Sequence, residues 1–456
     1  TLESGTGCVH TAPGHGVEDF DVCKKYPEIP VVVPVDSHGK LTSEAGEFAG
    51  LTTDEANKKI AAKLEETGHL FALQKMKHQY PHCWRCKKPV LFRATEQWFC
   101  SIDGFKKDAI EAIKDVKWIP GWGEDRITSM VQDRKDWCIS RQRKWGVPIP
   151  IFYCKDCSKA IINKEAMLNV AKVFREEGSD AWFKKSAKEL LPHDFKCECG
   201  CTEFTKEKDI MDVWFDSGST HAAVLEQRSN LAWPADLYLE GADQYRGWFQ
   251  SSLLTAVATK GKAPYKCVVT HGWVVDGEGR KQSKSLGNGI DPDEVINQYG
   301  ADILRLWVAS SDYHADIRIS KDILKQLSEA YRKIRNTARY ILGNLYDFDP
   351  NKDKVANSDL LPIDKWALIK LDELIKKSCE AYDNFNFHMV YHSVYNFCVV
   401  DMSNFYLDIL KDRLYVEKAD SKSRRAAQTT IYTILDALTK IISPILAYTS
   451  DEIWSY

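Results

Sequence analysis

The sequence has no apolar run near the length of about 20 residues that a lipid bilayer requires. It also has no low-complexity tract and no internal repeat. Hydrophobic residues make up 44% of its 456 residues and charged residues 28%, a balance typical of folded, water-exposed proteins. These features argue against a membrane span, a disordered chain and a repeat array. The length allows about two to four domains.

An excess of charge of one sign is also absent, because the formal net charge is only −3. A chain with this balance is not coated by nucleic acid over its whole surface, so any such contact must come from local basic patches. One candidate patch lies on a helical pattern that begins at residue 321 and could meet RNA phosphates. A solvated helix face is the better explanation for most of its cations. These cations are Lys325, Arg332, Lys333, Arg335 and Arg339.

Cysteine is not scarce, but fourteen in a chain of this length do not form a disulfide scaffold. Several stand in C-x-C or C-x-x-C spacing, which favours metal binding. Pairs of thiolates on two tight turns provide the tetrahedral site that zinc prefers. We therefore expect zinc at the segments "FYCKDC" and "KCECGC", with Cys201 as an alternative ligand. The expected ligands are Cys154, Cys157, Cys197 and Cys199.

A second knuckle, "HCWRC", contains Cys83 and Cys86 but has no clear second pair of ligands. Three interpretations remain open at this point. The missing ligands belong to sequence outside this chain, His82 or Cys100 joins the site, or no metal binds.

Strand and helix patterns alternate from about 210 to 310, which predicts a parallel α/β sheet. "YKCVVTHGWVV", 265–275, reads as a buried strand, and 292–300 as a helix with Asp291 as N-cap and Gly300 at its end. Ligands bind at the carboxyl ends of strands in such sheets. The segment "GRKQSKSLGN", 279–288, follows one of these ends. Its lysines and serines suit a triphosphate, although a solvated lysine loop would look similar.

Outside this region, "IPVVVPV" at 29–35 reads as a buried strand. A helix is expected at about 52–67, capped by Thr53 or Asp54. From 321 onward, apolar residues recur at spacings of three and four, which is typical of amphipathic helices. Similar patterns cover 363–381, 388–413 and 423–442 and predict a helical bundle.

Two tryptophan-containing segments combine carboxylates with glycine. Trp214 in "VWFDSG" and Trp248 in "EGADQYRGWF" could form the walls of an apolar pocket, with Asp243 binding an ammonium group and Glu240 a ribose hydroxyl. The alternative is that both tryptophans belong to the core. The opening "GTGCVHTAPGHGVEDFD" places histidines and carboxylates among glycines, which fits either a hydrolytic site or a polar turn without a catalytic role.

Taken together, these motifs resemble a known family. "KQSKS" at 281–285 resembles the KMSKS signature of class I aminoacyl-tRNA synthetases. "LEGADQYRGWFQSS", "VWFDSG", "WCISRQRKWGVPIP" and "GTGCVHTAPGHG" resemble the isoleucyl branch in its bacterial form, and the valyl and leucyl relatives carry different residues around "EGADQYRGWF". The similarity covers essentially the whole chain.

The resemblance implies an α/β plus all-α fold. Residues 1–80 would be the end of a β-rich editing domain, and 81–125 a cysteine-knuckle region. Residues 126–320 would be the second half of a Rossmann-type catalytic domain, with a zinc-type insertion at 154–201 and the KQSKS loop at 281–285. Residues 321–456 would begin a helical anticodon-binding domain.

The resemblance also implies the function. The family attaches isoleucine to tRNA(Ile) through an isoleucyl-adenylate, uses ATP with Mg²⁺, and hydrolyses mischarged valine. The pocket alone discriminates isoleucine from valine by about 150-fold, a figure for which the isoleucyl enzyme is itself the standard example. A monomer in the cytoplasm, without membrane contact, is expected.

The resemblance assigns roles to individual residues. Four loop residues would stabilise the departing pyrophosphate, namely Lys281, Ser283, Lys284 and Ser285. Lys284 would carry the main charge. The adenylate would contact Glu240, Gly241, Asp243, Gln244, His271 and Gly272. Trp214 and Trp248 would line the amino-acid pocket, and His10 and Asp19 would serve the editing site.

Two departures from the family pattern stand out. Gln282 replaces the methionine of the signature, and neither the HIGH tetrapeptide nor the threonine-rich strand of the editing site occurs in this sequence. We therefore expect this chain by itself neither to activate isoleucine nor to edit. A valyl-type synthetase, a zinc-ribbon RNA-binding module and a structural fragment without a site are the competing hypotheses.

Overall fold

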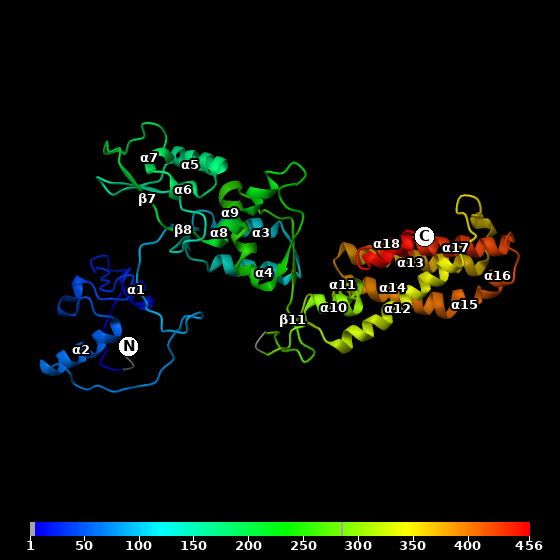
Figure 1. Cartoon of the computed structure of the whole chain (residues 1–456), viewed down its shortest axis with the longest axis horizontal. Helices are drawn as coiled ribbons and strands as arrows, with labels where there is room; N and C mark the ends of the chain where they lie inside the picture. The colour runs from blue at the N-terminus through cyan, green and yellow to red at the C-terminus, as the bar shows by residue number, and fades with distance from the viewer. Residues whose placement is uncertain (1–4, 284–285) are drawn as a thin grey trace. The chain divides into compact units, whose positions relative to one another are not determined.

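The structure is a computed structural model that describes residues 5–283 and 286–456. The chain divides into two compact units. The first comprises Thr1–Cys100 with Cys138–Arg141, and the second comprises Ser101–Trp137 with Gln142–Tyr456. Figure 1 labels the elements of both.

The first unit contains little regular secondary structure. Its elements are α1 (Val17–Cys23), the 3₁₀-helix η1 (Ser43–Phe48), α2 (Thr53–Glu66), β1 (Phe99–Cys100) and β4 (Ser140–Arg141). The expected β-rich character of residues 1–80 is wrong for 5–80, the part that the structure describes. These residues form helices and isolated β-bridges instead.

The strand predicted at 29–35 is also wrong. Pro30 and Pro34 have no backbone N–H to donate to a neighbouring strand, so the segment cannot be paired continuously. Val31 and Val32 are 45% and 51% exposed, and Val35 forms an isolated bridge with Leu41. Valine enrichment therefore indicated a buried strand where only Val35 is buried and no continuous pairing forms.

Helix α2 begins as predicted, but its cap is Thr52, one residue before Thr53 and two before Asp54. The Thr52 hydroxyl accepts the backbone N–H of Glu55, whose carboxylate accepts the N–H of Thr52. This reciprocal capping box satisfies two N–H groups that would otherwise lack partners.

The second unit is built around the predicted parallel sheet. β2 (Lys117–Ile119), β10 (Cys267–His271) and β9 (Tyr238–Gly241) pair in parallel in the order β2–β10–β9. β10 is central, and Val268 and Val269 are completely buried. The neighbouring helices are α3 (Lys106–Lys114), α4 (Trp122–Gln132), α8 (Val213–Gly218), the π-helix η2 (His221–Leu225), the 3₁₀-helix η3 (Ala242–Arg246) and α9 (Trp248–Lys260).

The strand predicted at 265–275 is interrupted. β10 ends at His271, and β11 (Val274–Val275) pairs in parallel with β12 (Ile317–Arg318) instead. The intervening Gly272 donates its N–H to the Tyr313 carbonyl oxygen at 2.9 Å, so the backbone changes partners there. Apolar periodicity cannot reveal such an exchange.

The segment flanked by the cysteine pairs folds around an antiparallel sheet of order β6–β5–β7. Phe152, Trp182 and Leu190 lie in its own buried cluster. Its elements are β5 (Phe152–Cys154), β6 (Ala160–Ile161), α5 (Lys164–Glu177), α6 (Ala181–Lys184), α7 (Ala187–Leu190) and β7 (Phe204–Lys206). The short β3 (Trp137–Cys138) and β8 (Ile210–Met211) flank this region in the sequence.

The predicted helix after the signature loop is confirmed. α10 (Pro292–Tyr299) begins after Asp291, whose carboxylate accepts the N–H of Asp293, and ends at Gly300 with φ 93°. α11 (Ala301–Ser310) follows directly.

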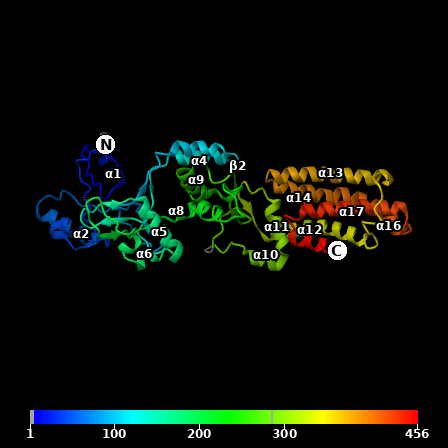
Figure 2. The same cartoon turned by 90° about the horizontal axis from the view of Figure 1, so that it is seen from above.

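The remaining residues form the predicted helical bundle, whose long helices run alongside one another in Figure 1 and Figure 2. The pattern at 388–413 is divided among several helices rather than one. The elements are α12 (Lys321–Gly343), η4 (Asn357–Asp359), α13 (Pro362–Asp383), α14 (Phe387–Asn396), the π-helix η5 (Phe397–Tyr406), α15 (Leu407–Ile409), α16 (Lys411–Tyr415), α17 (Lys422–Ile442) and α18 (Ala447–Trp454). Among the described helices, none has both the length and the apolar character needed to cross a membrane.

Candidate active site

The carboxyl ends of β9 and β10 bring three of the predicted site residues together. Gly241 pairs with His271 in the parallel register. A Cβ atom on Gly241 would lie 3.0 Å from Asp243 Oδ1 and 3.5 Å from His271 Cε1, so glycine keeps this approach open. Asp243 and the preceding Glu240 are exposed. Polar groups therefore converge at a strand end, where parallel sheets bind their ligands.

Gly272 lies against another segment of backbone. A Cβ atom there would lie 2.4 Å from the carbonyl carbon and oxygen of Ala315. The carbonyl oxygen of Gly272 is 2.8 Å from Nδ1 of His271, which orients the imidazole ring. Any larger residue at position 272 would move the ring away from the strand end.

Gln244, Gly247 and the two predicted tryptophans form one contact group. The Gln244 side-chain oxygen accepts the backbone N–H of Trp248 at 2.9 Å. A Cβ atom on Gly247 would lie 2.5 Å from that oxygen and 2.9 Å from the Trp214 ring. Gly247 therefore allows the indole of Trp214 and the amide of Gln244 to approach the start of α9 together.

The two tryptophans differ in their environment. Trp248 stacks on Tyr238, with ring centroids 4.0 Å apart and planes at 10°, and donates its indole N–H to the Ser217 carbonyl oxygen at 3.0 Å. Trp214 is 42% exposed. Trp248 is thus held on both sides by the fold, whereas Trp214 keeps an open face for a ligand.

Two carboxylates lie on the same helix as Trp214. Asp212, 4% exposed, accepts the Trp137 indole N–H at 3.0 Å and caps α8 through the backbone N–H of Trp214. Burial, together with the charge of the neighbouring Asp212, raises the pKa of Asp216 to about 6.

The signature loop is described only in part. Lys281 forms an antiparallel bridge with Val275 and is exposed. Gln282, at the position of the usual methionine, has a buried amide nitrogen without a hydrogen-bond partner among the described residues. The predicted residues Lys284 and Ser285 lie outside the described residues.

The predicted editing residues belong to the first unit. Asp19 is in the first turn of α1, and its carboxylate accepts the backbone N–H of Ala12 at 2.9 Å. His10 is exposed and precedes that amide by two residues. The Asp19 carboxylate therefore stabilises the glycine-rich turn that carries His10.

Four cysteines of the insertion come close together. The Sγ atoms of Cys154, Cys157, Cys197 and Cys199 all lie within 4.8 Å of one another. Accepting the backbone N–H of Cys157 lowers the pKa of Cys154 to about 6, toward the thiolate form that zinc binds. Cys201 instead contacts the backbone of Glu203, through the carbonyl oxygen at 3.4 Å and the N–H at 3.3 Å. The donor set fits a tetrahedral zinc ion, and the geometry favours Cys199 over Cys201 as the fourth ligand.

The second knuckle has a tight turn but no comparable cluster. Lys87, with φ 60°, donates its backbone N–H to the Cys83 carbonyl oxygen at 2.8 Å. Backbone N–H groups, first that of Cys86, lower the pKa of the Cys83 thiol. Within the described residues, neither His82 nor Cys100 joins the knuckle to form a group of three metal ligands.

Comparison with known proteins identifies the family. The family model described as "tRNA synthetases class I (I, L, M and V)" matches residues 19–320, and the "anticodon-binding domain of tRNA ligase" matches 364–456. The chain belongs to the class I tRNA synthetases. The family predicted from the motifs is therefore confirmed.

Among the relatives are two isoleucine–tRNA ligases. That of Caldicellulosiruptor saccharolyticus is 66% identical over 455 residues, and that of Caldanaerobacter subterraneus subsp. tengcongensis is 64% identical over 454. Both matches cover 100% of this chain but 49% of the relative. The chain thus spans about half the length of the curated relatives it matches.

Solved structures of the class share the fold at lower identity. The methionyl-tRNA synthetase of Mycobacterium tuberculosis in complex with methionyl-adenylate is 18% identical with a TM-score of 0.57, over 82% of this chain and 65% of that one. The Agrobacterium radiobacter K84 LeuRS in a ternary complex with tRNA and LeuAMS is 21% identical with a TM-score of 0.52, over 71% and 41%. These likenesses establish the class I catalytic fold with its helical domain.

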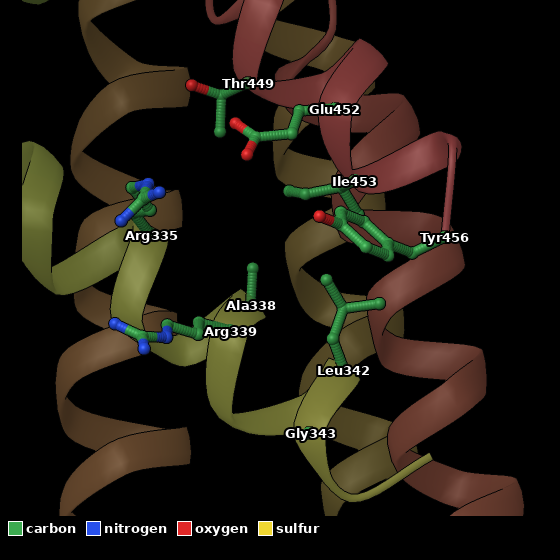
Figure 3. Close-up of a pocket in the computed structure, with 9 residues that line it drawn as sticks. All are labelled: Arg335, Ala338, Arg339, Leu342, Gly343, Thr449, Glu452, Ile453 and Tyr456. Atoms are coloured by element: carbon green, nitrogen blue, oxygen red, sulfur yellow. The ribbon is translucent and has the colours of Figure 1, made fainter. Parts of the chain in front are cut away.

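Four of the five basic residues noted on α12, all but Lys333, line two pockets that contain no strand-end residue. One, of about 440 Å³, is lined by Tyr299, Lys325 and Arg332 among others. The other, of about 600 Å³, lies between α12 and α18. Figure 3 shows Arg335 and Arg339 on one side of it and Glu452 on the other. Neither pocket contains a predicted adenylate residue.

Sequence reasoning missed several residues of this site. Tyr238, whose ring stacks on Trp248, has the sequence context of an ordinary strand residue. Gly247 has that of an ordinary turn residue. The glycine between Arg246 and Trp248 offered a signal, since glycine directly before a helix often permits close approach. Asp276 and Asn288, which flank the KQSKS segment, offered no pattern of their own.

Proposed function

We propose that this chain carries the nucleotide-binding and amino-acid-binding half of an isoleucine–tRNA ligase. The observation that carries the proposal is the convergence of Gly241, Asp243 and His271 at adjoining strand ends. The 66% identity to an isoleucine–tRNA ligase supports isoleucine as the substrate within the class. The protein would act in the cytoplasm as a monomer.

In the first step, a carboxylate oxygen of isoleucine attacks the α-phosphorus of ATP, the bond to the β-phosphate breaks, and pyrophosphate leaves. The exposed carboxylate of Asp243 holds the isoleucine ammonium, and Glu240 binds a ribose hydroxyl. Gln244 orients the same intermediate, while Gly241, His271 and Gly272 lie beside the adenosine. Trp214 and Trp248 enclose the isoleucine side chain. ATP arrives with Mg²⁺ as its counterion.

The KQSKS loop stabilises negative charge on the departing pyrophosphate. Charge-assisted contacts that form in the transition state lower the barrier, whereas equal binding of substrate and transition state does not. Lys281 and Ser283 provide a cation and a hydroxyl before the central lysine. Lys284 carries the main charge, with Ser285 beside it.

In the second step, a terminal ribose hydroxyl of tRNA(Ile) attacks the isoleucyl carbonyl carbon and AMP leaves. A minority of the basic residues of α12 would contact tRNA phosphates, the others forming a solvated helix face. His10 and Asp19 take part in hydrolysis of mischarged valine, with Asp19 holding the amino group. A structural zinc ion on Cys154, Cys157, Cys197 and Cys199 would stabilise the insertion without entering the reaction.

The decisive test uses the protein at the full length of its relatives and measures ATP–pyrophosphate exchange with isoleucine and with valine. Lys284→Ala should abolish most of the exchange while isoleucine binding persists, because the loop acts on the transition state. Gln282→Met, which restores the usual residue of the signature, should keep the activity.

The competing hypotheses give different results. A preference for valine would move the assignment to a valyl-type synthetase. Absence of exchange with every amino acid, together with RNA binding that Lys284→Ala weakens slightly, would favour an RNA-binding module.

A further inference from the structure

The segment before the signature forms a tight turn around one buried carboxylate. Asp276 is 7% exposed, and its Oδ1 accepts the backbone N–H of Glu278 at 3.0 Å and of Arg280 at 2.8 Å. Its Oδ2 accepts Nε of Arg280 at 2.9 Å. Gly279, with φ 84°, completes the turn by donating its N–H to the Asp276 carbonyl oxygen at 2.9 Å.

The same carboxylate reaches across the loop to its far end. Asn288 Nδ2 donates to Asp276 Oδ2 at 2.9 Å and to the Lys281 carbonyl oxygen at 3.2 Å. Asn288 Oδ1 accepts the backbone N–H of Ser283 at 3.0 Å. One amide side chain therefore holds the backbone of the first signature residues from both sides.

The chemistry of the pair explains why position 288 carries an amide. The donated bond from Asn288 and those from the backbone hold the pKa of Asp276 below its usual range, so the carboxylate is ionised. Asn288 supplies a donor toward this anion and the Lys281 carbonyl, and an acceptor toward the Ser283 amide. An aspartate at 288 would have no N–H to donate, and it would place a second negative charge beside the Asp276 carboxylate and the Lys281 carbonyl oxygen.

We infer that Asp276 and Asn288 are positioning residues, which hold Lys281 and Ser283 in the backbone conformation that the adenylation transition state requires. Neither side chain touches a substrate in this assignment. The inference rests on the proposed function for its catalytic consequence, while the clamp itself is a property of this chain. Displacing a charged group by about 1 Å costs up to about 100-fold in rate, so the pair has a measurable role.

The structural part of the test uses hydrogen exchange read at single amides. In Asn288→Ala, the Ser283 amide loses its acceptor Asn288 Oδ1, and the Asp276 carboxylate that accepts the Arg280 amide loses the donor across the loop, so both amides should exchange about tenfold faster. Unchanged exchange at both amides would overturn the clamp. This measurement needs no enzymatic activity, so it is independent of the proposed function.

The catalytic part uses pyrophosphate exchange by the protein at the full length of its relatives. Asn288→Asp and Asp276→Asn should each lower kcat about tenfold or more and leave KM for isoleucine within about twofold, as expected for groups that act only on the transition state. The reciprocal variant, Asp276→Asn with Asn288→Asp, restores one donor–acceptor pair and should recover part of kcat. A pair that only stabilised the hairpin would not separate kcat from KM in this way.

The matched control is Asp291→Asn, a nearby aspartate that caps α10 and makes no contact with the loop in the described residues. It should leave both the amide hydrogen exchange of Ser283 and Arg280 and the kcat of pyrophosphate exchange unchanged, because asparagine caps helices as well as aspartate does. Single variants with unaltered kcat, or a reciprocal variant no better than the worse single one, would overturn the inference. If the parent protein has no exchange activity with any amino acid, the proposed function fails, and the amide measurement still decides the clamp.

Discussion

The helical bundle and the strand ends of the second unit use charged residues in opposite ways. In the bundle, Asp364 is completely buried and receives both guanidinium nitrogens of Arg413 at 2.8 Å, together with the Tyr406 hydroxyl at 2.7 Å. At the strand ends, Glu240 and Asp243 are exposed. A buried charge must be fully paired within the fold, whereas an exposed charge beside a glycine-lined approach remains available to a ligand.

The insertion is a third case, in which the proposed partner of the side chains is a metal ion. Its four thiol sulfurs lie within 4.8 Å of one another, as a tetrahedral zinc site requires. The comparison therefore predicts different consequences when a partner is removed from each region.

The largest effect should follow removal of a zinc ligand. Cys199→Ser should reduce bound zinc from about one ion per chain to none and unfold the insertion, since structural zinc contributes about 10–16 kcal/mol in small zinc domains. Metal analysis and proteolysis of the insertion provide the measurement. Cys201→Ser is the matched control and should retain the metal, because its sulfur contacts the Glu203 backbone instead.

The second largest effect should follow removal of the buried carboxylate from the helical bundle. Asp364→Asn leaves the Arg413 guanidinium without its buried counter-charge, so we expect a loss of about 3–5 kcal/mol in the free energy of unfolding. Urea unfolding followed by helical circular dichroism measures it. Asp372→Asn, which breaks the exposed pair with Lys376, should cost less than about 1 kcal/mol. Equal losses in both variants would contradict the comparison.

A change in the proposed amino-acid pocket should lower substrate binding rather than the stability of the fold. In Gly247→Ala, the added Cβ would displace Gln244 and the Trp214 ring, which lie 2.5 and 2.9 Å from its position. We expect KM for isoleucine to rise about tenfold, with KM for ATP changed less, because one displaced pocket wall weakens binding by about 1–3 kcal/mol. Gly121→Ala, also directly before a helix but with nothing within 4 Å, is the control. Equal KM changes for both substrates would reject the pocket assignment.

The smallest effect concerns pH. Burial raises the pKa of Asp216 from 3.8 to about 6, so its protonated form is favoured in the fold. Stability should therefore fall as pH rises through this interval and level off above it. Asp216→Asn should be more stable than the parent at about pH 7 and similar near pH 4, measured by urea midpoints. A difference that does not change with pH would exclude this cause, and exposed Asp236→Asn controls for buffer effects.

Local sequence signals predicted the parts of the fold that depend on neighbouring residues. The cap and stop of α10 at Asp291 and Gly300 follow from side-chain and backbone chemistry within one turn. The apolar spacing from 321 onward predicted α12, because a helix face repeats regardless of what covers it. The prediction of a buried strand from valine enrichment failed at 29–35, where Val31 and Val32 are exposed between two prolines that cannot donate to a neighbouring strand.

The sequence by itself determined the family, the parallel sheet and the residue types that we propose to bind a triphosphate, an ammonium group and zinc. These properties reside in short motifs whose chemistry does not depend on distant residues. Only the tertiary structure decided that Gly241 faces His271, that Cys199 rather than Cys201 joins the other thiols, and that Asn288 reaches back to Asp276. Each of these is a contact between segments far apart in sequence or across a loop, and such contacts depend on strand register and backbone path, which no local pattern encodes.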